Sequence, residues 1–356
     1  DTLLSMAASA SLPAGVVATT FATEKKTLKE RLEQIMHSKM TKTRMIASLL
    51  AFVMLAGCAF LTGPKSFADD GAPAAIKTVE VSGVDEFLAA LDSNTEIVLK
   101  EGTYDLSTAS SYGSYVENGI WYWEEQYDGH QLVIRDVSNL TIRGAGADAT
   151  VISAEPRYAN VLSFISCRYI TLEGFTAGHT QLPGYCAGGV VSFENSGDVV
   201  IDGCGFYGCG TIGISGQNCR NMAITNTDIY DCSYGAVWLS GCRSVSFDGC
   251  EIRNHASATE PSVTFLFYLE SSDSIRITNS DIHDNFAQWL LLAGYSRNVV
   301  FAGNAVGNNA FLSGVFSSDR YGPVVEGCSF LDNSIINWYD GNGVFAVDAE
   351  GNKLST

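Results

Sequence analysis

The chain has 356 residues, with 21 lysines and arginines against 39 aspartates and glutamates, so its formal net charge is −18 at pH 7. Residues 1–68 hold eight of the basic and four of the acidic residues, which leaves 13 basic and 35 acidic residues in the rest. This acidic part excludes a nucleic-acid partner, because phosphate binding requires the opposite charge. It also repels a bare polyanionic glycan unless a cation bridges the two.

Residues 46–62 form an uncharged apolar segment that ends at Gly63-Pro64. At about 1.5 Å of rise per residue, a helix of this length is at the short end of a bilayer span. Seven of the eight basic residues precede the segment, so the positive-inside rule predicts that residues 1–45 are a cytoplasmic basic helical segment. The acidic part is then held at the cell membrane on its outer side.

Two other interpretations use the same apolar segment. If translation starts at Met36 or Met40, the segment is the core of a signal peptide. Cleavage then occurs either at the lipoprotein-type sequence Leu55-Ala-Gly-Cys58 or after Ala68, which gives a lipoprotein or a secreted protein. All three interpretations export the acidic domain, with residues 63–77 as a linker.

The domain itself is predicted over residues 78–356. Its first elements are a short amphipathic helix at residues 84–91 and a strand at residues 95–99. A helix in this position would cap the open end of a solenoid core, as solenoid ends require.

A short phrase then recurs along the chain, with an apolar anchor followed two residues later by Gly or Asn. The anchors are 30, 29, 23, 23, 30, 24 and 24 residues apart, which is solenoid spacing. Gly and Asn accept a left-handed backbone with little steric cost, so the phrase predicts a stack of equivalent turns. The anchors are Ile142, Leu172, Ile201, Ile224, Phe247, Ile277, Phe301 and Val325.

A second apolar row lies ten residues before the next anchor in each repeat. Because this interval is constant, all variation in length must fall on one side of the coil. Short alternating strands separated by Gly or Asn turns predict an all-β parallel β-helix rather than a leucine-rich repeat. The second row comprises Leu132, Leu162, Val191, Ile214, Val237, Phe267, Leu291 and Val315.

Cysteines and serines share one turn position of the predicted stack. Neighbouring members would be about 4.8 Å apart, whereas a disulfide requires Cβ atoms about 3.8 Å apart. We therefore predict buried free thiols rather than disulfides in this row, and likewise for Cys209 and Cys232 at another turn. The row comprises Cys167, Ser196, Cys219, Cys242, Ser272 and Ser296.

The repeat, its Gly and Asn turns and the segment Asn94–Tyr104 resemble right-handed parallel β-helix proteins of the pectin-lyase-like superfamily. The resemblance covers residues 78–350 and implies a right-handed solenoid. That fold hosts lyases, hydrolases, adhesins and non-catalytic proteins, so it does not by itself imply an activity.

Residues 1–62 resemble a different family. The sequences Asp1–Ala7 and Thr23–Met36, followed by the apolar segment, are similar to the end and last transmembrane helix of β-lactam-sensor antirepressor membrane zinc metallopeptidases. The resemblance implies that a cytoplasmic peptidase precedes this chain, since the chain contains no His-Glu-x-x-His. It departs from that family by carrying a β-helix where a penicillin-binding sensor domain is expected.

Long connections after three of the anchors, beside two short ones, predict a cleft. Aromatic rings, histidines and carboxylates in such a cleft are typical of a glycan site. Packing of these loops on the coil is the structural alternative. The predicted ligand-binding residues are Glu155, Arg157, Tyr158, Tyr185, Tyr207, Tyr230, Tyr234, His255 and Glu260, and His179 and Asp231 are candidate catalytic residues.

A second candidate is an outward row formed by Arg143, Glu173 and Asp202 on successive coils. Two close carboxylates could bind Ca²⁺ or act as a catalytic pair, with the arginine beside them, roughly as in polysaccharide lyases of this fold. Ordinary solvated side chains are the alternative. Beyond this possible Ca²⁺, no cofactor or metal site is predicted.

A third row, Trp238, Tyr268, Leu292 and Phe316, is predicted to align on the outer surface. Exposed apolar rows of this size mark a contact surface or are covered by a neighbouring loop.

No complete catalytic motif is present in the sequence: there is no Gly-x-Ser-x-Gly, no phosphate-binding loop and no zinc-type cysteine spacing. The sequence therefore favours a membrane-anchored recognition or sensor domain that binds a polysaccharide or cell-wall glycan. A carbohydrate-active enzyme, either a lyase or a hydrolase, is the alternative.

Overall fold

A computed structural model describes residues 76–116, 119–181, 188–208, 212–255, 265–318, 327–337 and 346–347. The chain divides into two compact units, Asp1–Pro73 and Ala74–Thr356, and every described residue belongs to the second. The predicted segments 1–45 and 46–62 lie outside the described residues. Among the helices that are described, none has the length and apolar character needed to cross a bilayer.

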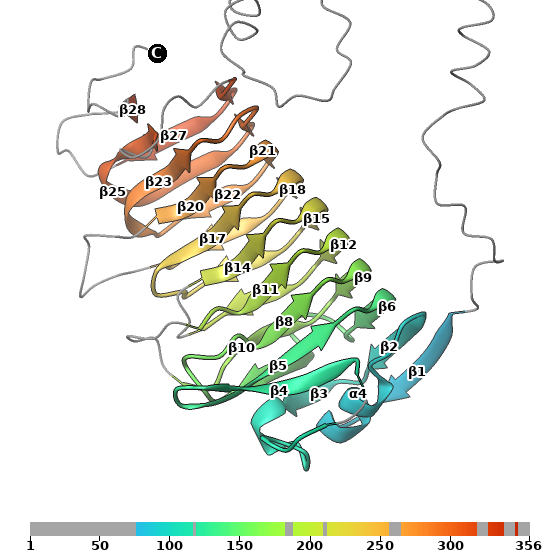
Figure 1. The fold of residues 1–356 in the computed structure, drawn as a ribbon. Helices are drawn as coiled ribbons and strands as arrows, with labels where there is room; N and C mark the ends of the chain where they lie inside the picture. Colours follow the sequence, from blue (N-terminus) through green and yellow to red (C-terminus); the bar gives the residue numbers. More distant parts are fainter. Residues whose placement is uncertain are drawn as a thin grey trace, which may run out of the picture. The chain divides into compact units, whose positions relative to one another are not determined.

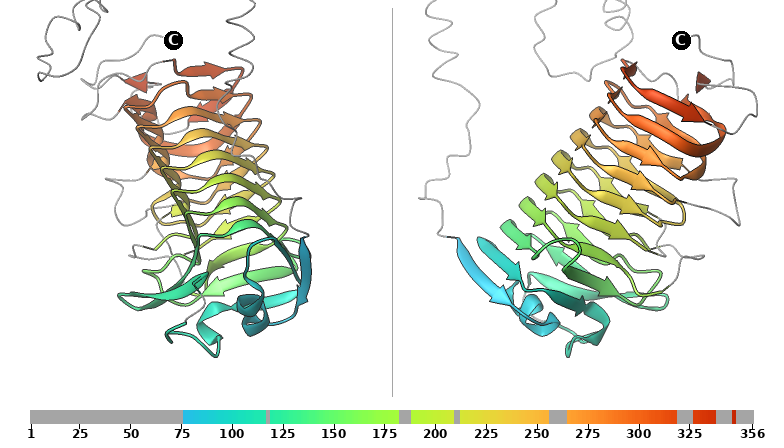
Figure 2. Two further views of the ribbon diagram at one scale, coloured as in Figure 1. Left: turned by 45° about the vertical axis from the view of Figure 1, so that its right-hand side comes forward. Right: turned by 180° about the vertical axis from the view of Figure 1, so that it is seen from behind.

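The second unit is a stack of coils in which every turn of the chain contributes one strand to each of three parallel sheets, here called A, B and C (Figures 1 and 2). Sheet A has ten strands in chain order, which is the order expected of a solenoid. They are β1 (Lys77–Val81), β2 (Thr95–Leu99), β6 (Ser138–Arg143), β9 (Arg168–Glu173), β12 (Gly197–Asp202), β15 (Arg220–Thr225), β18 (Arg243–Asp248), β21 (Asp273–Thr278), β24 (Val300–Ala302) and β26 (Ser329–Leu331).

In every coil but one, sheet B follows sheet A after a two-residue turn; the exception is the six-residue connection 144–149. Most strands of sheet B are only three or four residues long. The long strand β25 runs from sheet B into sheet C. The strands of sheet B are β3 (Gly102–Asp105), β7 (Thr150–Ala154), β10 (Thr176–His179), β13 (Gly205–Tyr207), β16 (Asp228–Tyr230), β19 (Glu251–Arg253), β22 (Asp281–His283), β25 (Ala305–Ser318) and β27 (Ser334–Asn337).

Sheet C closes each coil, and most of the variation in connection length lies between sheets B and C, on the side predicted; the longer connection 144–149 lies between sheets A and B instead. The first two strands form an antiparallel hairpin. The strands of sheet C are β4 (Trp121–Gln126), β5 (Gly129–Arg135), β8 (Leu162–Ile165), β11 (Val191–Glu194), β14 (Ile212–Gln217), β17 (Gly235–Ser240), β20 (Phe265–Glu270), β23 (Phe286–Gly294) and β28 (Ala346–Val347), together with the end of β25.

The N-terminal cap is present as predicted. Helix α4 (Val84–Ala90) buries Phe87 and Leu88 against the first coil, and a short 3₁₀ helix, η2 (Leu106–Thr108), follows β3. The buried Tyr104 donates its hydroxyl to the carbonyl oxygen of Val81 at 2.8 Å. Burial of these rings closes the apolar end of the solenoid.

The predicted anchor row is confirmed from Ile142 to Phe301, because these residues pair in register along sheet A and are all fully buried. The last anchor was wrong. Phe301 pairs with Phe330, not with Val325, so the final coil is five residues longer than the repeat suggested.

The second row is confirmed from Leu162 to Leu291 in sheet C, but its last member was also wrong. Leu291 pairs with Phe316 because the pairing of β23 with β25 shifts by one residue between Ala287 and Trp289. A shift of one residue exchanges the two faces of a strand. Phe316 therefore points inward and is 5% exposed, so it does not belong to the exposed apolar row.

The turns after the anchors have left-handed backbones at six of the predicted positions, which confirms the reason for Gly or Asn there. Gly144 is an exception, since its φ is not positive. A Cβ at this glycine would lie 2.2 Å from the carbonyl oxygen of Gly174, so close packing of two turns explains its identity. The six positions are Gly174, Gly203, Asn226, Gly249, Asn279 and Gly303.

Polar side chains stack at the turns and pair with the backbone of the neighbouring coil. The amides of Cys167 and Cys242 donate to the hydroxyls of Ser196 and Ser272 at 3.0 and 3.1 Å. All seven cysteines in the described part of the chain are free, and six of them are buried. The prediction of buried free thiols is thereby confirmed for Cys167, Cys219 and Cys242 of the row and for Cys232, whereas Cys209 lies outside the described part. Burial raises the pKa of the Cys167 thiol to about 11.

Candidate functional site

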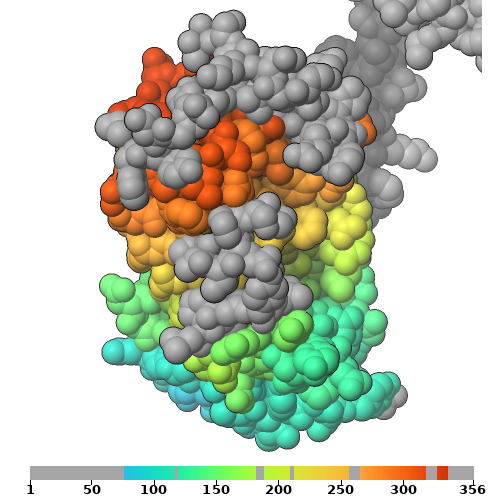
Figure 3. Space-filling view, turned by 90° about the vertical axis from the view of Figure 1, so that its left-hand side faces the viewer, coloured from blue at the N-terminus to red at the C-terminus, as the bar shows by residue number. Residues whose placement is uncertain are grey.

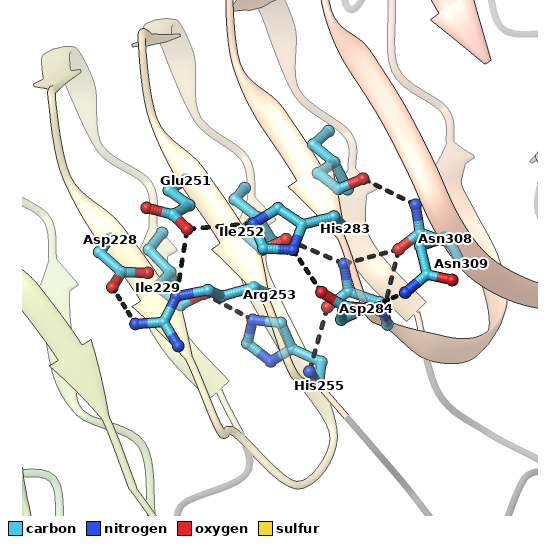
Figure 4. A network of polar contacts seen from close by, with 12 residues as sticks. Asp228, Ile229, Glu251, Ile252, Arg253, His255, His283, Asp284, Asn308 and Asn309 are labelled. Atoms are coloured by element: carbon cyan, nitrogen blue, oxygen red, sulfur yellow. Dashed lines mark hydrogen bonds and ion pairs between the residues drawn. The ribbon is translucent and has the colours of Figure 1, made fainter. Parts of the chain in front are cut away.

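The outer face of sheet B carries a continuous row of large side chains. Register places Tyr207, Tyr230, Arg253 and His283 on four successive coils, and we call these four residues the ridge. Two residues earlier on the same strands, Asp228, Glu251 and Asp281 form a parallel acidic column. Side chains two residues apart on a strand point to the same face, and the residue between them is buried in β16, β19 and β22, so both rows face outward. Figure 4 shows four of these residues, Asp228, Glu251, Arg253 and His283.

The ridge begins with a stacked pair of tyrosines. The rings of Tyr207 and Tyr230 have centroids 5.5 Å apart and are inclined by 22°. A Cβ at Gly178, the next residue down the row, would lie 2.5 Å from the ring of Tyr207, so a glycine is required for the ring to lie there. Within the described chain no hydrogen bond engages either hydroxyl, and both can bind a ligand.

Arg253 covers the other end of the stack. Its guanidinium carbon lies 4.3 Å from the centroid of the Tyr230 ring, which is a cation–π contact. Arg253 also pairs with Asp228 and, through Nε at 3.3 Å, with Glu251. Partial burial raises the pKa of Tyr230 to about 12, and the nearby Asp228 adds to this.

Asp228 has an unusual environment for a carboxylate on an outer face. Oδ2 contacts Arg253, whereas Oδ1 is buried and has no hydrogen-bond partner among the described residues. Burial raises the pKa of Asp228, although Arg253 acts in the opposite direction. The carboxyl group is therefore easier to protonate than an exposed aspartate.

His283 closes the ridge between two carboxylates. Nε2 lies 3.0 Å from Oε1 of Glu251, the same oxygen that accepts from Arg253, and Nδ1 lies 2.7 Å from Oδ2 of Asp284. Both contacts are donor bonds only when the ring is protonated. The bond to Asp284, followed by that to Glu251, raises the pKa of His283.

Two predicted histidines lie inside the domain. His255 is 2% exposed, and its Nε2 and Nδ1 face the carbonyl oxygens of Ile229 and Cys232 at 3.0 and 3.3 Å. Burial lowers the pKa of His255 to about 4. His255 therefore stabilises a turn, and its prediction as a ligand-binding residue of an exposed cleft was wrong because the ring is buried.

His179, a candidate catalytic residue, is also 2% exposed. Nε2 donates to the carbonyl oxygen of Ala159 at 2.9 Å, which leaves Nδ1 as a bare acceptor with no partner in the described structure. Burial lowers the pKa of His179, so the ring is neutral. Because its ring is buried, His179 is not part of the exposed surface that the ridge and the acidic column form.

The structure brings together only part of the predicted cleft. Tyr207 and Tyr230 belong to the ridge, and Asp231 follows Tyr230 in a turn with a left-handed backbone, φ 54°. Tyr234 lies three residues beyond and stacks edge-on with Phe265 at 5.4 Å. Two further candidates, Tyr185 and Glu260, lie outside the described residues.

Glu155, Arg157 and Tyr158 lie in the connection from β7 to β8, two to three coils from the ridge tyrosines. The backbone amides of Arg157 and Tyr158 are bound by the carboxylate of Asp128, at 2.7 and 3.1 Å. These residues form a separate surface of the domain.

The second candidate row exists on sheet A, where Arg143, Glu173 and Asp202 are in register. Arg143 pairs with Glu96 at 3.1 Å and with Glu173 at 3.4 Å. Asp202 instead accepts from Thr225 and Asn226 at 2.6 and 2.8 Å, and these bonds lower its pKa. No group of three or more His, Cys, Asp or Glu side chains suited to a metal occurs in the described ranges.

The third row retains three of its four members. Trp238, Tyr268 and Leu292 are in register on sheet C, but the next residue is Ser317 because of the shift in β25. Trp238 is 43% exposed and its ring lies 6.1 Å from that of Tyr268.

Sequence reasoning missed Asp228, Glu251, Arg253 and His283. A constant interval would have found them. From the anchor Leu172 onward the inward residue of the sheet B strand comes five residues after the anchor, as in Ile201 to Phe206. The residue of the acidic column comes fourth and the ridge residue sixth. Figure 3 shows the succession of coils on one side of the domain, where the colour passes from green through yellow to orange and red in chain order.

Comparisons with known proteins agree with this architecture. A family model described as right-handed β-helix region matches residues 188–356, just under half of the chain. The domain is therefore a right-handed parallel β-helix. No curated protein matches the chain significantly.

Several solved structures are similar at low identity. An alginate lyase from Paenibacillus sp. str. FPU-7 is 13% identical, with 74% of this chain and 98% of that chain covered and a TM-score of 0.48. Pectin methylesterase PemA from Erwinia chrysanthemi is 13% identical, with 66% and 79% covered and a TM-score of 0.43. PfbA, a surface adhesin of Streptococcus pneumoniae, is 12% identical, with 74% and 80% covered and a TM-score of 0.40.

Proposed function

We propose that the β-helix domain is a carbohydrate-recognition module that binds a neutral glycan along the ridge of sheet B. The observation that carries this proposal is the stacked pair Tyr207 and Tyr230 beside Arg253, Asp228 and Glu251. No residue in the described ranges is hydrogen-bonded to either tyrosine hydroxyl. Tyrosine rings provide apolar area with a polar tip, and the adjacent charged groups can hydrogen-bond to sugar hydroxyls.

The charge of the domain favours a neutral ligand. Residues beyond 68 carry 35 acidic against 13 basic side chains, and on the ridge Arg253 is already paired with two carboxylates. A polyanionic glycan would meet repulsion unless a cation such as Ca²⁺ bridged it. As part of the same proposal, residues 46–62 anchor the module at the cell membrane, with the β-helix outside.

The test is retention of the full chain on xylan, β-1,3-glucan, peptidoglycan and polygalacturonate, with and without Ca²⁺. The amount of new reducing or unsaturated ends is recorded in the same samples. Retention on a neutral polysaccharide without cleavage supports the proposal. If the chain binds none of the four polysaccharides, or binds polygalacturonate alone, the proposal is contradicted.

A hydrolase is a second candidate, favoured by one observation. Asp228 has a raised pKa, and Glu251 occupies the matching position on the neighbouring strand, about 4.8 Å away along the sheet. Two neighbouring carboxyl groups, one of them with a raised pKa, can act as acid and base on a glycosidic bond. New reducing ends that disappear in Asp228→Asn would support this candidate, and an absence of cleavage would remove it.

A further inference from the structure

We propose that a second aromatic surface, formed by Tyr127 and Tyr158, extends the carbohydrate site, so that the domain selects long glycan chains over short oligosaccharides. We call this pair the tip platform. The inference rests on the proposed function of the ridge and adds to it the class of ligand, a linear polysaccharide.

The two rings of the tip platform are packed together yet open to solvent. Their centroids are 5.0 Å apart and their planes are inclined by 57°. Tyr127 is 88% exposed and Tyr158 is 37% exposed. Exposed aromatic rings held in contact leave ring faces free for a partner, and the apolar face of a sugar ring is a matching surface.

The platform is fixed in place by neighbouring polar contacts. Asp128, at the tip of the β4–β5 hairpin, accepts hydrogen bonds from the backbone amides of Arg157 and Tyr158. These bonds tie the hairpin to the connection between β7 and β8. The hairpin turn supplies Tyr127 and the connection supplies Tyr158. A Cβ at Gly129 would lie 2.5 Å from Cγ of Pro156, which shows how closely the two segments approach.

Position relative to the ridge is the main argument for a shared ligand. Tyr158 follows β7 at the corner between sheets B and C, and Tyr207 and Tyr230 end strands that enter the same corner. Strand β7 is two coils below β13 and three below β16. At about 4.8 Å per coil, the ridge tyrosines stand roughly 10 and 14 Å above the level of β7.

Figure 1 shows the tip of the β4–β5 hairpin extending toward the side of the domain where sheets B and C are connected. A linear chain that lies along the solenoid axis at this corner can therefore contact the tip platform and the ridge together. Two contacts on one rigid domain raise affinity for a ligand long enough to reach both, because the second contact forms at high effective concentration.

The test is a length series measured by isothermal titration calorimetry with xylo-oligosaccharides and β-1,3-gluco-oligosaccharides of two to ten sugar units. The full chain is compared with Tyr127→Ala/Tyr158→Ala, with Tyr207→Ala/Tyr230→Ala and with Tyr169→Asn. Tyr169 is 59% exposed on sheet A and has a left-handed backbone that asparagine accepts, so it is a matched control.

For the wild type we expect the dissociation constant to fall by about tenfold once the chain spans both surfaces, the size expected of one aromatic stacking contact. Tyr127→Ala/Tyr158→Ala should lose this gain and keep the short-chain affinity. An unchanged length dependence in this variant overturns the inference and leaves the ridge proposal intact. Absence of binding by the wild type at every length refutes the ridge proposal, and the extended site with it.

Discussion

His255 occupies the turn position that asparagines fill in the next two coils. Asn285 and Asn309 donate Nδ2 to the carbonyl oxygens of Ile252 and Ile282 at 2.9 and 2.7 Å, and the Nε2 of His255 contacts the equivalent oxygen of Ile229. From sequence alone a lone histidine beside a long connection could equally be a binding residue. Only the stacking of the coils reveals it as a member of a buried row.

We predict that His255→Asn makes the protein more resistant to acid. The pKa of His255 is lowered from about 6.5 to about 4 in the folded state. Between these pH values the unfolded chain binds a proton at this residue and the folded chain does not. Stability is therefore lost as pH falls from about 6.5 to about 4, by roughly 3 kcal/mol. Urea denaturation at pH 7 and pH 4.5 should show a smaller loss in His255→Asn than in the wild type.

His283 acts in the opposite sense and serves as an internal comparison. Its pKa is raised by Asp284 and Glu251, so its contribution to stability is present below about 6.5 and is lost as pH rises through the raised value. His283→Gln should therefore be destabilised more at pH 5.5 than at pH 9. Equal losses of stability at the two pH values would show that protonation of His283 does not strengthen its contacts with Asp284 and Glu251.

We predict that Arg253→Gln weakens glycan binding and lowers stability only modestly. Arg253 is partly exposed, so its pairs with Asp228 and Glu251 are expected to contribute about 1 kcal/mol or less. Loss of the guanidinium should raise the pKa of Asp228 further, which a carboxyl NMR titration can follow. Arg276→Gln, at an exposed position on β21, is the control and should leave that pKa unchanged.

Among the secondary-structure elements, the strands of the earlier coils were more predictable than those of the last coils. Short alternating strands with Gly or Asn turns at fixed offsets placed the anchors from Ile142 to Phe301 correctly. The C-terminal coils were not predictable in this way, because one additional residue in β25 moved Phe316 inward and a longer last coil moved the anchor to Phe330. Apolar residues also stand at the positions that the repeat predicts, Val315 and Val325, so the apolar pattern alone does not reveal either change.

We predict that Asn285→Ala lowers the free energy of unfolding by about 2–4 kcal/mol. The buried side chain accepts from the amide of His255 at 3.0 Å and donates to Ile252, so its removal leaves a buried donor and a buried acceptor unpaired. Chemical denaturation measures the effect. Gln217→Ala, an exposed substitution on β14, should stay within about 0.5 kcal/mol of wild type; similar losses in both variants would argue against the turn rows as a source of stability.

For the whole molecule, the acidic composition, the solenoid and the cap helix were all predictable, whereas the main feature of the candidate site was not. Tyr207 and Tyr230 were identified by residue type, but Arg253 and His283 join them only through register between coils. The predicted histidines were misleading because burial, which depends on the complete stack, turned both inward.

We predict that the native domain resists thiol reagents at six of its cysteines. Burial keeps the reagent away from all six thiols. At Cys204 and Cys250 it also raises the pKa to about 12 and about 11, which leaves little reactive thiolate at pH 8. Mass spectrometry after iodoacetamide treatment should find these six cysteines labelled only after unfolding. Rapid native labelling of any of them would show that the coils open. The six are Cys167, Cys204, Cys219, Cys232, Cys242 and Cys250.

The ridge is tested most directly by affinity electrophoresis of the full chain through gels that contain xylan or β-1,3-glucan. Wild type, Tyr207→Ala/Tyr230→Ala and the control Tyr169→Asn are run side by side, with circular dichroism to show that each is folded. We expect wild type and Tyr169→Asn to be retarded equally by one of the two neutral glycans, and the ridge variant to lose at least about tenfold in affinity. Equal retardation of all three proteins, or of none, would contradict glycan recognition by the ridge.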